Sequence, residues 1–271
     1  HLDDRQRELD PAGFGEFCHL VLRDFGLDSE ARDATDPDLI REFLWQRLAI
    51  RLRERFGADL PLAVFVQAEG LRQRLAQFAQ IQAAERAAGW RLIGTEQGFG
   101  RDDAFLIGGL PVRGRIDRIE EHEGDGRLRI LDYKTGDKAE TPGQRHLAKF
   151  HPGADPDYTR VVVKGKERRW CDLQLPIYRL MLAATDSERN LVCGYFNLPK
   201  AVGDVGICEW HELDTELLAG AARCAEQVAG QIRQGVFWPP ATTVPHDDFA
   251  ELFAGGMALT LAGNEWLEGA P

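Results

Sequence analysis

The chain has 271 residues, of which 44% are hydrophobic and 28% charged, and this ordinary globular composition excludes a wholly disordered protein. No stretch approaches the ~20 apolar residues of a membrane span, and the N-terminus lacks the apolar core of a signal peptide, so we expect a cytoplasmic protein. The formal net charge of −11 argues mildly against nucleic acid as a partner, because phosphate binding draws on clustered Lys and Arg.

Helical patterns dominate the N-terminal third, residues 1–89. They cover residues 10–25, about 36–56 and about 60–89. In the first of these, apolar residues fall on one side of the helix and His19 lies next to the apolar stripe. The chain begins with His1 rather than Met, and we interpret it as a fragment of a longer polypeptide.

After Trp90 the pattern changes to β-type composition with partial alternation, punctuated by glycines. We expect strands within residues 91–99, 104–121 and 127–136. A helix is expected from Asp172 to Ala184, and then come two strands and a last amphipathic helix, at 191–199, 206–213 and 214–234. This order predicts an α/β domain of α+β-like character, in which helices flank a central mixed sheet and no repeat is visible.

Residues 138–170 show no clear period, and we expect a long loop of a kind that is usually functional or mobile. Eight Lys or Arg face four Asp or Glu here, so the segment is basic inside an acidic chain. A basic loop could hold a nucleic-acid backbone, but a solvated loop without a partner explains the charge equally well. The tail, 236–271, is predicted to pack back on the body through Phe237, Trp238 and Phe249.

The segment GRIDRIEEHEGDGRLRILDYKTG carries the candidate chemistry. Asp117 falls in one predicted strand, and Asp132 and Lys134 end the next. Alternation puts Asp132 and Lys134 on one face of the strand and Tyr133 on the other, and a hairpin would bring Asp117 beside them. Two carboxylates and an ammonium suit a Mg²⁺ or Mn²⁺ site for phosphodiester hydrolysis. A surface ion pair is the ordinary alternative for a bare Asp-x-Lys.

GRIDRI and ILDYKTG, followed by QLPIY at 174–178, together resemble three consecutive signatures of the RecB-type nucleases of the PD-(D/E)XK superfamily. Such domains stand at the C-terminal ends of RecB and AddB helicase–nuclease subunits. The resemblance implies a restriction-endonuclease-like core and metal-dependent cleavage of DNA. It assigns metal binding to Asp117, Asp132 and the carbonyl of Tyr133, and catalysis to Lys134.

The same resemblance implies roles for Gln174, Tyr178 and His19, which lie outside the hairpin, and the position of Glu96 in the strand before the hairpin adds a further candidate. Gln174 and Tyr178 are four residues apart, hence on one helix face, and are expected to line the active site. FGEFCHLVL places His19 where the family carries a metal-binding histidine, and Glu96 could point into the same site. We also expect five cations to contact nucleic acid: Arg115, Lys164, Lys166, Arg168 and Arg169.

The five cysteines are odd in number and include no C-x-x-C pair, so we expect reduced, mostly buried thiols. Many relatives close the fold with cysteines that hold an iron–sulfur cluster, and three of these follow the last helix. Residues 235–253 contain no cysteine, so the chain resembles the cluster-free branch and we expect no iron–sulfur cluster.

The sequence therefore predicts one nuclease domain over 1–271, with a catalytic core at 90–235. We expect a DNA nuclease of recombination or repair that acts on ends or single strands beside a helicase. A catalytically inactive DNA-binding or scaffold domain is the main alternative. A third, an enzyme on small phosphoesters, lacks a nucleotide-binding fingerprint, because KTGDK has no earlier glycine of a phosphate-binding loop.

Overall fold

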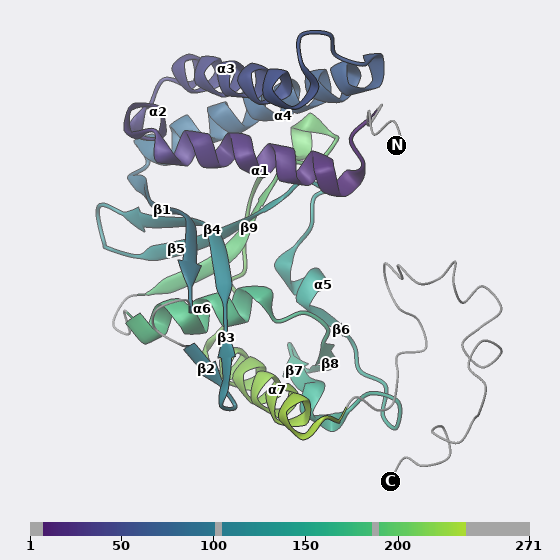
Figure 1. Cartoon of the computed structure of the whole chain (residues 1–271). Helices are drawn as coiled ribbons and strands as arrows, with labels where there is room; N and C mark the ends of the chain where they lie inside the picture. Colours follow the sequence, from purple (N-terminus) through teal and green to yellow (C-terminus); the bar gives the residue numbers. More distant parts are fainter. Residues whose placement is uncertain (1–7, 101–104, 186–189, 237–271) are drawn as a thin grey trace, which may run out of the picture.

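The computed structural model describes residues 8–100, 105–185 and 190–236. Four helices form a layer on one face of a central sheet (Figure 1). They are α1 (Pro11–Leu27), α2 (Ser29–Asp33), α3 (Pro37–Phe56) and α4 (Leu62–Ala87). Asp10, Asp28 and Asp36 accept hydrogen bonds from backbone amides at the starts of α1, α2 and α3, which satisfies donors that a helix leaves free. The predicted helical N-terminal part is confirmed.

The central sheet has five strands in the order β1–β4–β5–β9–β10. Their bounds are β1 Trp90–Phe99, β4 Gly114–His122, β5 Leu128–Lys134, β9 Leu191–Asn197 and β10 Gly206–Glu209. Neighbouring strands are antiparallel except β5 and β9, which are parallel. Helices α6 (Gln174–Thr185) and α7 (Thr215–Gln234) lie on the side opposite α1 (Figure 1). The mixed sheet between helical layers confirms the predicted fold class.

Strand β5 is buried on both faces because helices cover the sheet from both sides. Leu131 and Tyr133 pack into the core formed with α1, α3 and α4. Ile130 packs into the other core, formed with α6 and α7. Since side chains alternate along a strand, Asp132 and Lys134 share the α6 side with Ile130.

A network of buried charges crosses the sheet between β4 and β5. Glu120 accepts hydrogen bonds from both Arg118 and Arg129, and all three residues are buried. The guanidinium of Arg118 lies beside the stacked rings of Phe78 and Phe196, at 5.9 and 5.6 Å from their centroids. Burial opposes ionisation of Glu120, but the charges of Arg118 and Arg129 outweigh it and lower its pKa. Glu120 therefore stays ionised inside the protein.

The loop prediction for residues 138–170 was wrong. The segment contains the short helix α5 (Pro142–His146) and a three-stranded antiparallel sheet in the order β6–β8–β7. Its strands are β6 Leu147–Lys149, β7 Arg160–Val163 and β8 Lys166–Trp170. Strands of three to five residues are too short to display a clear period, which is why the pattern did not reveal them. A smaller hairpin of β2 (Phe105–Ile107) and β3 (Leu110–Val112) also lies beside α7.

Within the described residues, none of the helices has the length and apolar character to cross a membrane. The cysteines are free, and three of the five are buried: Cys18, Cys193 and Cys224. Cys208 is half-buried and Cys171 is exposed. The predicted packing of the tail falls outside the described residues.

Candidate active site

The site forms where β4 and β5 part. Their ladder stops at the pair Arg118–Leu131, while β4 remains paired with β1 and β5 with β9. Just beyond this pair, the backbone N–H of Tyr133 has no backbone partner on β4. It donates instead to Oδ2 of the Asp117 carboxylate, at 2.9 Å. The structure thus brings Asp117 to the end of β5, as the hairpin pattern predicts.

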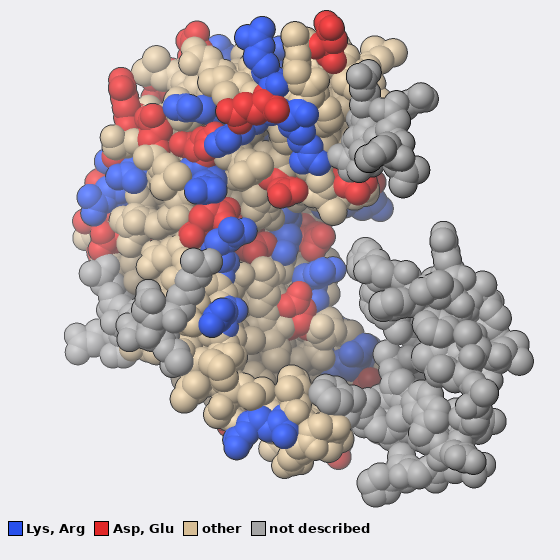
Figure 2. Space-filling view, viewed as in Figure 1, with Lys and Arg blue, Asp and Glu red and all other residues tan. Residues whose placement is uncertain are grey.

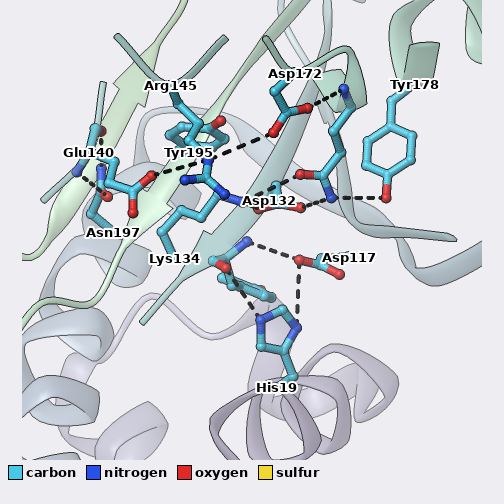
Figure 3. Close-up of polar contacts among 12 residues, drawn as sticks. His19, Asp117, Asp132, Lys134, Glu140, Arg145, Asp172, Tyr178, Tyr195 and Asn197 are labelled. Carbon is cyan, nitrogen blue, oxygen red and sulfur yellow. Dashed lines mark hydrogen bonds and ion pairs between the residues drawn. The ribbon is translucent and has the colours of Figure 1, made fainter. Parts of the chain in front are cut away.

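Asp132 and Lys134 form one hydrogen-bonded group with helix α6 (Figure 3). Lys134 Nζ lies 2.7 Å from Asp132 Oδ2, and the side-chain amide of Gln174 donates to Asp132 Oδ1 at 2.9 Å. Gln174 also accepts from Lys134 at 3.4 Å and donates to the Tyr178 hydroxyl at 3.2 Å. Both carboxylate oxygens of Asp132 therefore have partners, and the orientation of the carboxylate is determined by β5 and α6 together.

Tyr133 contributes its backbone to the site and its side chain to the core. The ring is buried beside Phe78 and Phe196, on the α1 side of the sheet. Its carbonyl oxygen lies 3.3 Å from Nε2 of His19. Helix α1 thus positions His19 against the end of β5, with the imidazole edge-on to the Tyr133 ring.

Glu96 reaches the same place through an unusual backbone conformation. Its φ of 50° lies in the left-handed region, which is unfavourable for a residue with a side chain. Its carboxylate approaches Nδ1 of His19 at 3.9 Å, and Asp117 approaches the same nitrogen at 3.6 Å. Alternation within β1 gives no indication of this, because a bulge between Leu92 and Gly94 shifts the register before Glu96.

The site has a strongly negative potential. Burial by itself would lower the pKa of His19, but the nearby carboxylates of Asp117 and Glu96 and the charge of Asp132 raise it to about 10. Burial and repulsion by Asp117 raise the pKa of Asp132 to about 6, against the opposing effect of Lys134. The acids that stabilise the protonated form of His19 also attract other cations.

These residues fit a divalent metal ion. His19, Glu96 and Asp117 each offer a ligand atom, and the three atoms lie within 4.8 Å of one another. The charge of Asp132 acts on both His19 and Asp117, so a fourth donor borders the group. Carboxylate oxygens with one imidazole nitrogen suit Mg²⁺ or Mn²⁺.

The cations predicted to contact nucleic acid divide between two places. Arg115 is 69% exposed at the rim of the site, and its Nε lies 2.7 Å from Glu96. The other four lie on or between β7 and β8, on the small sheet beside α7 (Figure 1): Lys164, Lys166, Arg168 and Arg169. Two of these are paired with acids, Lys164 with Glu212 at 2.8 Å and Arg169 with Asp155 at 3.3 Å. The basic segment is thus partly neutralised.

A second series of polar contacts next to Lys134 involves residues that were not predicted from the sequence. The ring of Tyr195 lies 4.8 Å from Lys134 Nζ (Figure 3). Its hydroxyl lies 2.9 Å from Nε2 of His146. The other ring nitrogen of His146 lies 2.9 Å from the carbonyl oxygen of Asp172, just before α6. Tyr195 faces Asp132 across the parallel β5–β9 pair, a pairing that no local pattern in the sequence indicates.

The fold and the site together define a restriction-endonuclease-like α/β protein with an acid–lysine centre at the open end of its sheet. The family model of the PD-(D/E)XK nuclease superfamily matches residues 1–245, and the chain belongs to that superfamily. The superfamily is one of nucleases, and membership indicates a phosphodiester hydrolase that acts on nucleic acid. A comparison with curated proteins found no match.

Proposed function

We propose that the chain is a metal-dependent DNA nuclease of the RecB/AddB type, with Asp117, Asp132 and Lys134 at its catalytic centre. The observation that best supports this is the single hydrogen-bonded group that joins Asp132 and Lys134 to Gln174 and Tyr178. Asp117 joins them through the backbone of the same strand. All three sequence signatures therefore meet at one place in the fold.

The donors proposed to hold Mg²⁺ or Mn²⁺ share one feature, an oxygen or imidazole nitrogen at the end of β5. They are His19, Glu96, Asp117, Asp132 and the carbonyl of Tyr133. When bound, the ion would supply a Lewis acid for the phosphoryl oxygen and lower the pKa of water at the site. Asp117 turns Oδ2 toward this place, since that oxygen lies 3.6 Å from Nδ1 of His19 and also accepts from the Tyr133 amide.

Lys134 is proposed to stabilise the negative charge that develops on the phosphate as water attacks phosphorus and the phosphorus–oxygen bond breaks. Its ammonium is held between Asp132, Gln174 and the ring of Tyr195, so its direction is set before substrate binds. Gln174 fixes Asp132 through a direct hydrogen bond. Preorganised charge of this kind is most effective where water is excluded, and Asp132 is buried.

The charge of the chain supports a partner for DNA binding. The net charge is −11, and on the face seen in Figure 2 the Lys and Arg side chains are interspersed with Asp and Glu. We therefore propose that a helicase domain or subunit delivers DNA ends or single strands, in recombination or repair. We also propose that 1–271 form one nuclease domain of such a larger protein, with its catalytic core at 90–235.

The test is hydrolysis of end-labelled single- and double-stranded DNA with Mg²⁺ or Mn²⁺, for the native chain and the variants Asp132→Asn and Lys134→Met. We expect each variant to lose at least about a hundred-fold in rate, as in the removal of a preorganised charge. The matched control is Asp125→Asn, in the turn at the opposite end of the β4–β5 hairpin, which should cleave like the native chain.

Two results would contradict the proposal. Equal loss of activity in Asp125→Asn would mean that damage to the hairpin, rather than to the site, explains the variants. Absence of cleavage with either metal, with DNA binding unchanged in all variants, would favour the inactive DNA-binding or scaffold domain.

A further inference from the structure

A cavity of about 630 Å³ adjoins the proposed active site. Its wall includes Thr135 and Gly136, the two residues that follow Lys134. Figure 1 shows the chain leaving β5 beside the N-terminal end of α1. The contact is close, since a Cβ on Gly15 would lie 3.1 Å from Oγ1 of Thr135. Gly15 precedes His19 by about one helical turn, so the cavity lies next to the proposed metal site.

One wall of the cavity is cationic. Arg74 is only 6% exposed, and its Nη1 donates to the carbonyl oxygens of Thr135 and Leu198 at 3.3 and 3.0 Å. In the described part of the chain no carboxylate forms an ion pair with it. Lys200 also lines the cavity and pairs with Asp137 at 2.8 Å. The charge of Asp137 acts on Arg74 from beyond ion-pair distance. A largely buried guanidinium without a carboxylate in direct contact favours an anionic ligand, because its charge is costly to bury alone.

The wall next to Arg74 is largely apolar. Pro11, Phe14 and Val66 line it, and the Arg74 guanidinium lies 4.7 Å from the Phe14 ring. Gln73 also lines the cavity, and its amide makes no hydrogen bond with any described residue. A flat apolar surface, a free amide and a guanidinium match the three parts of a nucleotide: the faces of its base, the edge of its base and its phosphate.

We propose that this cavity binds one unpaired nucleotide of the substrate strand next to the cleaved phosphate, with its phosphate on Arg74 and its base on Phe14. The inference rests on the proposed nuclease function and adds a binding subsite to it. A base inside a duplex is paired and stacked, so it can enter the cavity only after it is unpaired. The subsite therefore selects single strands and frayed ends, and it accepts any base, because every base can stack.

Gly70 offers a direct test. It lies within α4 on the cavity wall, and no atom is within 4 Å of the position that its Cβ would take. The Cβ of Gly70→Leu therefore meets no neighbour, its side chain extends from the cavity wall, and it replaces a residue that weakens helices. Gly230→Leu is the matched control, because Gly230 lies within α7, also has no atom within 4 Å of its Cβ position, and is not part of this cavity.

The experiment measures Kd by fluorescence anisotropy for a labelled single strand with Ca²⁺, and KM and kcat for its cleavage with Mg²⁺. In Gly70→Leu we expect Kd and KM to rise about ten-fold with kcat unchanged, which is within the effect of losing one base–aromatic stack. Gly230→Leu should match the native chain. In a series of strands that each carry one abasic position, the native chain should lose affinity at one position and Gly70→Leu at none.

Unchanged Kd, KM and abasic response in Gly70→Leu, with cleavage intact, would overturn the subsite and leave the nuclease function standing. The expected binding changes without cleavage by the native chain would support the subsite and contradict the catalytic assignment. A native chain that neither binds nor cleaves single strands would overturn both.

Discussion

The ammonium of Lys134 is held from two sides. Asp132 accepts from it at 2.7 Å, and the ring of Tyr195 lies 4.8 Å away. The Tyr195 hydroxyl is in turn anchored on His146, which is fully buried and stacked on Trp210 with 5.0 Å between centroids. Under the proposed function, Tyr195 and His146 are positioning residues, since they contact Lys134 and its surroundings and would act on a substrate only through Lys134.

Tyr195→Phe keeps the ring beside Lys134 and removes its anchor. We expect kcat to fall about ten-fold with KM unchanged, and stability to fall by about 1–3 kcal/mol because His146 keeps an unsatisfied buried nitrogen. Steady-state kinetics and urea unfolding measure the two effects. Tyr158→Phe, which removes a hydroxyl bonded to Gln231, is the control and should leave kcat unchanged. An equal loss of kcat in both variants would remove the positioning role.

The backbone of Glu96 is strained at the position that brings its side chain into the site. Glu96→Gly should raise the unfolding free energy by about 1 kcal/mol, because glycine accepts a φ of 50° without penalty. It should also weaken Mn²⁺ binding about ten-fold or more through the lost carboxylate. Chemical denaturation and titration calorimetry test the two parts separately.

Lys164→Gly is the control for the predicted gain in stability and loss of Mn²⁺ affinity in Glu96→Gly. Lys164 is the other described non-glycine residue with positive φ, at 51°, and it lies between β7 and β8. The substitution should stabilise the chain by a similar amount and leave Mn²⁺ affinity unchanged. Weaker metal binding in Lys164→Gly would show that the Glu96 result does not report on its carboxylate.

At the scale of elements, the buried charges between β4 and β5 predict acid sensitivity. The pKa of Glu120 is lowered in the folded chain, so its ionised form stabilises the fold above the ordinary pKa of 4.5, and this contribution is lost as pH falls through the lower folded value. Glu120→Gln should cost about 3–5 kcal/mol at pH 7, since it leaves two arginines without their buried partner.

Urea unfolding of the native chain and Glu120→Gln, between pH 7 and pH 3, measures the contribution of ionised Glu120 to stability. The difference in unfolding free energy should shrink below pH 4.5, because the Glu120 carboxyl binds a proton in the unfolded chain before it does in the folded chain. Glu54→Gln, which breaks an exposed pair with Arg51, should change stability by less than about 1 kcal/mol at any pH. A difference that is constant with pH would mean that the pKa of Glu120 is the same in the folded and the unfolded chain.

The sequence predicts well those elements whose formation depends on residues close to one another in the chain. Capping aspartates and apolar stripes predict α1 and α3, and alternation places Asp132 and Lys134 on one face of β5. Short strands such as β6 have too few residues to show a period. Glu96 and Tyr195 reach the site through a bulge and a long-range strand pairing, neither of which leaves a local pattern.

At the scale of the whole molecule, an acidic chain with a partly neutralised basic hairpin predicts a modest salt dependence of DNA binding. Lys166 and Arg168 form no ion pair with the described residues. If they hold a strand, replacing both with Gln should make the slope of log Kd against log salt concentration shallower by about two. Fluorescence anisotropy across a salt series measures the slope.

The control replaces Arg41 and Arg72 with Gln. Both are paired with acids on α3 and α4, at 2.6 and 3.0 Å, and they lie in the helical layer. This double variant should keep the native slope. An unchanged slope in the Lys166 and Arg168 double variant would place the DNA backbone elsewhere on the molecule.

The parallel pairing of β5 with β9 also bears on how the protein folds. Asp132 and Tyr195 are register partners but stand 63 residues apart in the chain, with the small sheet and α6 in between. Their pairing requires the chain to close over that whole intervening segment. Contacts between residues so far apart in the sequence slow folding. Helical signal should therefore return early after dilution from denaturant, while nuclease activity returns only when this last long-range contact closes.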